Sequence, residues 1–254
     1  MARSQPHLRH PHLGRRHSPA RHPRDVLPIS WQTAQMNPVD TPLPSLSDQV
    51  DRLIDLGVPA LLGQTNEDLR AAADHLSSLE VDNALLVPSS LPCDYADLMR
   101  LIVLDGKPGF VVEDFTDAAS FVPVEGADSA SVILPDTWYL LEDPRRGDEF
   151  SNASPAEALR DISAEGRLPL TMAEGIFWAF QNPDIIERNH CFMTIGSRKP
   201  TAKGGFDSRT PALWISNGTG RDGKDNRNAP KLGWCWWNNR HTWLGIAHAA
   251  NRTG

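Results

Sequence analysis

Two secondary-structure patterns divide this sequence near residue 181, and they limit the folds open to the chain. Before that point, Ser154–Glu157 and Thr171–Glu174 each place a hydroxyl three residues ahead of a glutamate, which is the capping-box signal for a helix start. After it, short apolar segments alternate with loops rich in Gly, Asn and Arg, a pattern typical of strands. The sequence predicts an α+β fold: mixed helices and strands in the N-terminal two-thirds, then a C-terminal antiparallel β-sheet with strands near 191–195, 212–216, 233–237 and 242–247.

Further helices and strands are expected in the first two-thirds. Ser45 and Thr65 are good caps for two helices, and Asp94 begins a third that we expect to continue through Leu104. Short apolar runs predict strands at 84–88, 110–112 and 138–141. No apolar run approaches the roughly 18 residues of a membrane helix, so we expect no membrane span.

The first 35 residues differ from the rest in composition. They contain six Arg, five His, five Pro and one Asp, without apolar periodicity. Such a segment buries too little apolar surface to offset its ordering entropy. We expect residues 1–35 to be a disordered basic extension, with Met36 as a credible true start, and residues 36–254 to form a single α+β domain. A basic tail that binds nucleic acid or membrane is the alternative interpretation.

Charge is unevenly distributed over the remainder. Residues 36–170 have a net charge of −17 and residues 171–254 a net charge of +5. An anionic ligand should therefore meet the C-terminal part, whereas the large acidic excess argues against nucleic acid as the partner. Three cysteines, an odd and small number, suit a reducing cytoplasm.

The segment 233–243 is the main candidate for function, because it contains four tryptophans beside polar side chains. An indole N–H needs an acceptor, and tryptophan is enriched where one side of a surface is dry and the other wet. We expect a Trp-lined, cationic pocket for a small anionic or polar ligand. Its residues would be the stacking rings Trp236, Trp237 and Trp243, the hydrogen-bonding groups Asn239 and His241, and the cations Arg240 and Arg221.

Residues 218–223 match the pattern G-x-G-x-x-G. A dinucleotide-binding fold requires a helix after these glycines, but loop residues follow here, so we expect no nucleotide cofactor. Gly218 and Gly220 could instead form a backbone nest for an anion beside Arg221. A solvated loop between two strands is the alternative.

Three side chains are candidates for catalysis. A thiolate nucleophile needs a nearby imidazole or cation, which makes Cys235 with His241 one possibility and Glu174 with His241 another. Glu174 is also explained by the cap alone, as the reciprocal partner of Thr171. We expect no metal site, because neither Cys-x-x-Cys nor His-x-x-x-His occurs in the chain.

Several segments together resemble an uncharacterised family of bacterial proteins of unknown function. The resemblance covers about residues 45–249 and is strongest over 168–249, where it rests on the segments 189–198, 209–216, 218–223, 233–236 and 239–245. It implies a compact bacterial cytoplasmic protein and supplies no activity. Binding of a small ligand is our first hypothesis. A hydrolase or transferase, and a protein-interaction module whose acidic half docks a basic partner, are the alternatives.

Overall fold

The computed structural model describes residues 42–124, 134–135 and 137–254. These residues all lie within one compact unit, Met36–Gly254. The extension expected over residues 1–35 and the start at Met36 lie outside the described residues, so the predicted domain division stays a prediction. Helices and strands are both abundant, and the strands form several sheets. This mixture confirms the α+β class.

The helices begin where the sequence places their caps. Ser45, Thr65, Ser154 and Thr171 each accept a hydrogen bond from the backbone three residues on. The last three of these caps are complete capping boxes. Among the described residues, none of the helices has the length and apolar character needed to cross a membrane. The α-helices are α1 (Leu46–Asp55), α2 (Val58–Leu61), α3 (Asn66–Ser77), α4 (Tyr95–Leu101), α5 (Pro155–Ala164) and α6 (Met172–Gln181).

One expected helix end is wrong. Helix α4 ends at Leu101, and the chain turns at once into β2 (Val103–Leu104), which pairs with β3 (Lys107–Pro108). Asp105 and Gly106 both adopt positive φ between these strands. The apolar side chains at 102 and 104 fitted a helical period, but the tight turn places them in extended backbone instead.

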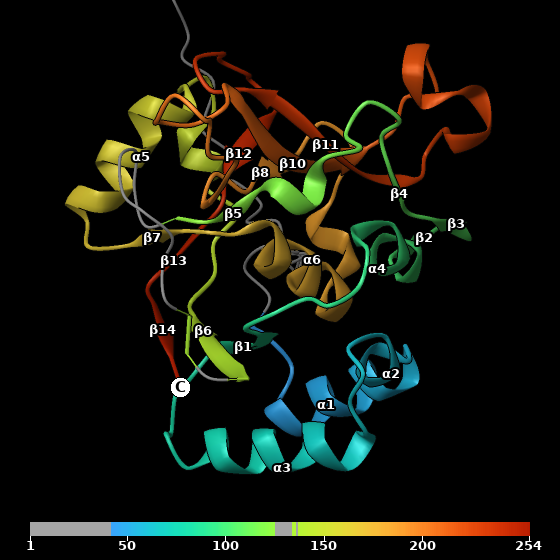
Figure 1. Cartoon of the computed structure of the whole chain (residues 1–254), viewed down its shortest axis with the longest axis vertical. Coiled ribbons are helices and arrows are strands. Elements are labelled where there is room, and N and C mark those ends of the chain that lie inside the picture. Colours follow the sequence, from blue (N-terminus) through green and yellow to red (C-terminus); the bar gives the residue numbers. More distant parts are fainter. Residues whose placement is uncertain (1–41, 125–133, 136) are drawn as a thin grey trace, which may run out of the picture. The chain divides into compact units, whose positions relative to one another are not determined.

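A three-stranded antiparallel sheet has the order β1 (Ala84–Pro88), β6 (Trp138–Glu142) and β14 (Asn251–Thr253). Helices α1 and α3 contact each other, and α1 contacts β1 while α3 contacts β6. Figure 1 shows this group of helices and strands around the C-terminus of the chain. The two edge strands of this sheet, β1 and β14, therefore come from segments more than 160 positions apart in the sequence.

A second sheet has five strands in the order β12 (Leu244–Ile246), β8 (Cys191–Met193), β10 (Arg209–Ile215), β11 (Pro230–Trp236) and β4 (Phe110–Val111). Its centre is antiparallel, as expected, because β10 pairs with both β8 and β11 in that sense. The edge strand β12 pairs in parallel with β8, and the edge strand β4 at the other side pairs in parallel with β11. The sheet is thus mixed, and it includes a strand from the N-terminal half.

Helix α6 contacts both β1 and β10, and Figure 1 shows it between the two sheets. Its apolar side chains, including Ile176, Phe177 and Phe180, are almost completely buried. Two further strand pairs connect distant segments: β5 (Val122–Pro123) with β9 (Ser197–Arg198), and β7 (Leu168–Pro169) with β13 (His248–Ala249).

Candidate functional site

The C-terminal tryptophans separate into two groups. Trp234 packs edge-on against Trp236 with ring centroids 4.7 Å apart, whereas Trp243 packs edge-on against Trp214 at 6.4 Å. Two of the predicted stacking residues, Trp236 and Trp243, therefore lie in different ring pairs. Trp236 and Trp243 are the more exposed members, with 45% and 36% of their surface accessible.

Trp237 lies against a cation that the sequence analysis did not single out. The guanidinium carbon of Arg198, in β9, is 3.7 Å from the centroid of the Trp237 ring and 5.1 Å from that of Phe206. Arg198 is only 4% exposed. Its Nη2 donates to the carbonyl oxygen of Asp207 at 2.9 Å, while its buried Nε has no hydrogen-bond partner. We call Arg198, Phe206 and Trp237 the Arg198 site.

The carboxylates described near the Arg198 site form ion pairs with other cations. Arg209 forms ion pairs with Asp117 at 2.6 Å and with Asp207 at 2.8 Å, and Lys199 pairs with Asp117 at 2.7 Å. Hydrogen bonds from Arg209 hold the pKa of the Asp117 carboxyl well below its usual range. Both carboxylates are thus engaged by Arg209 and Lys199, and burial lowers the pKa of Arg198 to about 10. Within the described residues Arg198 forms no ion pair, and the Asp207 carboxylate, already paired with Arg209, only partly offsets the effect of burial on the pKa of Arg198.

The other predicted polar residues lie apart from this site. Arg240 is exposed, forms an ion pair with Glu157 and donates to the Asn152 carbonyl at 2.9 Å. Asn239 is exposed in the turn after β11. The side chain of Arg221 lies outside the described part of the chain. Arg240 is therefore already neutralised by an acidic partner, whereas no ion pair of Arg198 is found among the described residues.

The His241 ring packs edge-on against Trp243, with centroids 5.5 Å apart. Its buried Nε2 has no hydrogen-bond partner, and burial lowers the pKa of the imidazole. Cys235 is part-buried in β11, opposite Thr210 in β10. No hydrogen bond joins the side chains of Cys235 and His241 in the described part of the chain, so the thiol–imidazole pair remains a prediction.

Glu174 is completely buried and has local structural partners. One oxygen accepts from the Thr171 backbone at 2.6 Å, as the capping box requires, and the other accepts from the Tyr139 hydroxyl at 2.7 Å. Arg252 donates to both oxygens, at 2.5 and 2.9 Å. Burial alone would raise the pKa of Glu174, but the Arg252 guanidinium and the hydrogen bonds from Thr171 and Tyr139 together lower it. These bonds give the carboxylate a structural role, and its catalytic pairing with His241 stays a prediction.

The glycine-rich loop is held by its own polar groups. Ser216 Oγ accepts from the Gly218 backbone at 3.0 Å and donates to Asp222, which forms a buried ion pair with Lys231 at 2.6 Å. Gly218 has a φ of 67° and lies against Arg227, while Gly220 has a φ of 57° and faces open space. The two glycines permit a tight loop between β10 and β11, and Lys231 is already used within it.

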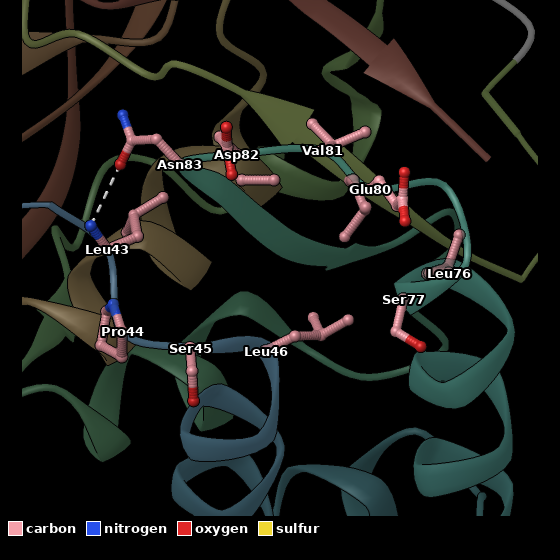
Figure 2. A pocket seen from close by; sticks show the side chains of 12 residues that line it. Leu43, Pro44, Ser45, Leu46, Leu76, Ser77, Glu80, Val81, Asp82 and Asn83 are labelled. Carbon is pink, nitrogen blue, oxygen red and sulfur yellow. Dashed lines mark hydrogen bonds between the residues drawn. The ribbon is translucent and has the colours of Figure 1, made fainter.

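We describe three cavities, of about 510, 790 and 390 Å³, and no tryptophan lines any of them. The first lies between the segments 43–46 and 80–84, which are joined by a hydrogen bond from the Leu43 backbone to Asn83 (Figure 2). Glu80 and Asp82 line it and no cation does, so it suits an anion poorly. The described residues contain no group of three or more His, Cys, Asp or Glu able to hold a metal ion.

A model of a family of unknown function, DUF5701, matches residues 52–254. The chain therefore belongs to that family, in agreement with the resemblance seen in its motifs. No curated protein and no solved structure matches the chain. Membership assigns no activity, so any function has to be argued from the residues above.

Proposed function

We propose that this member of the DUF5701 family binds a small anionic ligand at the Arg198 site. The observation that carries the proposal is a guanidinium only 4% exposed, stacked on Trp237 and without a carboxylate partner in the described part of the chain. A charge removed from water is costly unless it is paired. A bound carboxylate or phosphate would supply the missing partner.

The comparison with the other well-buried arginines supports this interpretation. Arg146 forms ion pairs with Asp148 and Glu187, and Arg252 forms one with Glu174. Within the described part of the chain, the Arg198 guanidinium donates to a carbonyl oxygen and lies against two aromatic rings, without an ion pair of its own. Guanidinium groups bind carboxylates and phosphates in a two-pronged manner, and Nε and Nη1 of Arg198 have no acceptor among the described residues.

Aromatic neighbours suggest that the ligand includes a ring. Trp237 and Phe206 lie against the Arg198 guanidinium, and Trp236, which precedes Trp237 in the chain, is 45% exposed. Exposed indoles stack on planar rings and sugars. This stacking contributes binding energy without requiring a fixed arrangement of hydrogen-bond donors and acceptors. Nucleotides and sugar phosphates are therefore the first ligands to test.

Calorimetric titration with inorganic phosphate, AMP and glucose 6-phosphate tests the proposal. At least one probe should bind, and Arg198→Gln should weaken that binding 10-fold or more while the variant still unfolds cooperatively. Trp237→Phe should weaken it less, because a smaller ring remains beside the guanidinium.

Arg240→Gln is the matched control, since it removes an exposed arginine of the same region that already has an acidic partner. Its affinity should equal that of the unmodified protein. The proposal is wrong if no probe binds at millimolar concentration, or if Arg240→Gln abolishes binding and Arg198→Gln does not.

A further inference from the structure

We propose a second binding site, for a small zwitterion such as a free amino acid or a short peptide, in the cavity of about 790 Å³. We call it the Arg188 cleft. Its charged lining residues are Asp105, Asp184, Glu187, Arg188 and Arg227. The acids come from the β2–β3 turn and the segment around the short helix η4 (Pro183–Ile185), and Arg227 comes from the loop before β11.

Arg188 is oriented by neutral groups. Its Nη1 donates to the Asn217 side-chain oxygen at 3.0 Å, and its Nη2 donates to that of Asn228. Amide oxygens fix the position of a guanidinium without cancelling its charge. The cleft therefore presents a positioned cation whose charge remains available to a carboxylate.

The acidic side chains of the cleft do not neutralise that cation. Asp105 and Asp184 are exposed and form no ion pair within the described residues, and Glu187 is held by Arg146 at 2.8 Å. The lining thus has three carboxylates and two guanidinium groups. A simple anion would be repelled by the carboxylates, and a simple cation by the guanidinium groups. A molecule with both an ammonium and a carboxylate satisfies both signs.

An apolar portion of the lining indicates what lies between the charged ends. Leu104, Ile186 and Ile215 also line the cleft. These side chains favour an aliphatic ligand side chain, because apolar area removed from water contributes roughly 25 cal/mol per Å². A volume of about 790 Å³ is ample for two or three amino-acid residues.

The walls of the cleft are held in place. Asn228 has a φ of 70°, and its backbone N–H donates to Ser216 at 2.9 Å. Ser216 in turn donates to Asp222, whose buried ion pair with Lys231 fixes the same loop. A preformed site loses less conformational entropy on binding, so measurable affinity for a small ligand is reasonable here.

Calorimetric titration with leucyl-leucine tests the inference, with N-acetyl-leucyl-leucine and leucyl-leucine amide as blocked probes. The zwitterion should bind, and each blocked form should bind at least 10-fold more weakly, because it lacks one charged end. Arg188→Gln and Asp184→Asn should each weaken binding 10-fold or more. Glu67→Gln, which removes an exposed carboxylate from α3, should leave it unchanged.

Absence of binding by leucine and leucyl-leucine at millimolar concentration would overturn the inference, as would equal affinity for the blocked probes. The site is separable from the Arg198 site. Arg198→Gln should keep leucyl-leucine binding, and Arg188→Gln should keep the phosphate-ligand binding tested above. Loss of the dipeptide affinity in Arg198→Gln, with that variant still folded, would contradict the assignment to the cleft.

Discussion

At the scale of single residues, two glutamates have the same local role in very different surroundings. Glu174 and Glu157 are both third residues of their helices, complete capping boxes and accept from an arginine of the C-terminal segment. Glu174 is fully buried with Arg252, whereas the Glu157–Arg240 pair is exposed. Removing one partner of a buried ion pair leaves an uncompensated charge in the interior. In an exposed pair, water solvates the remaining charge, so the loss of stability is small.

We therefore expect Glu174→Gln to lower the free energy of unfolding by about 3–5 kcal/mol, the range for breaking a buried ion pair. Glu157→Gln, the matched control, should cause a much smaller loss. Urea denaturation of the three proteins measures both. Equal losses of unfolding free energy in the two variants would show that burial of the Glu174–Arg252 ion pair does not determine how much it stabilises the protein.

The same residues show how far the sequence predicts the site. The capping box of Glu174 is predictable because Thr171 is only three residues away. Its ion pair with Arg252 joins residues 78 positions apart and depends on β14 reaching the first sheet. Arg198 was missed for a similar reason: its neighbour Trp237 is distant in the sequence, and a single arginine after an apolar strand has no distinctive pattern.

At the scale of elements, short-range signals predict most helix starts and the β10–β11 hairpin, whereas the sheet edges depend on distant segments. Strand β4 joins β11 from about 120 positions away, and β12 joins β8 in parallel. Neither pairing follows from the alternation of apolar residues, since that alternation is the same in parallel and antiparallel strands.

Where another backbone approaches such an edge closely, the residue at the contact has to be small. Gly147 illustrates that requirement. It precedes η3 (Asp148–Phe150) with a φ of 75°, its carbonyl accepts from Ile246 in β12 at 3.1 Å, and an added Cβ would collide with the Ile246 backbone. We expect Gly147→Ala to destabilise the protein by about 1–2 kcal/mol from backbone strain and about 1–3 kcal/mol more from the collision.

Gly166→Ala is the control for that experiment, because Gly166 has a similar φ of 68° with open space around it. It should show only the strain component. Thermal denaturation of both variants separates the two effects. A melting temperature for Gly147→Ala equal to that of Gly166→Ala would mean that the contact with β12 tolerates a side chain.

At the scale of the whole described unit, the acidic and basic parts of the sequence pair with each other. Arg209 and Lys199 bind Asp117, and Arg240 binds Glu157. The sequence predicts the charge asymmetry but not this pairing, because each contact joins residues 82 or more positions apart. Much of the positive charge expected to be available for a ligand therefore stabilises the fold, whereas Arg198 is a buried cation that forms no ion pair within the described residues.

Buried histidine makes the stability of this unit dependent on pH. His248 is 1% exposed; its Nδ1 accepts from Arg167 at 2.6 Å and its Nε2 donates to Glu149 at 2.9 Å, which requires the neutral ring. Burial lowers the pKa of His248 below the ordinary 6.5, with Arg167 acting in the same direction and Glu149 opposing it. As the pH falls through 6.5, the unfolded chain therefore takes up the proton before the folded one.

Stability from His248 should be complete above about pH 7 and should decline below 6.5, by at most about 1.4 kcal/mol per pH unit. His248→Gln should flatten the dependence of melting temperature on pH between 7 and 5, because an amide oxygen can accept from Arg167 and its NH₂ can donate to Glu149 without titrating.

His75→Gln, which changes an exposed histidine on α3, is the control and should keep the original slope. His241, whose pKa burial also lowers, should leave a residual slope in the His248 variant. An unchanged slope in His248→Gln would show that protonation of this ring does not control the dependence of stability on pH between 7 and 5.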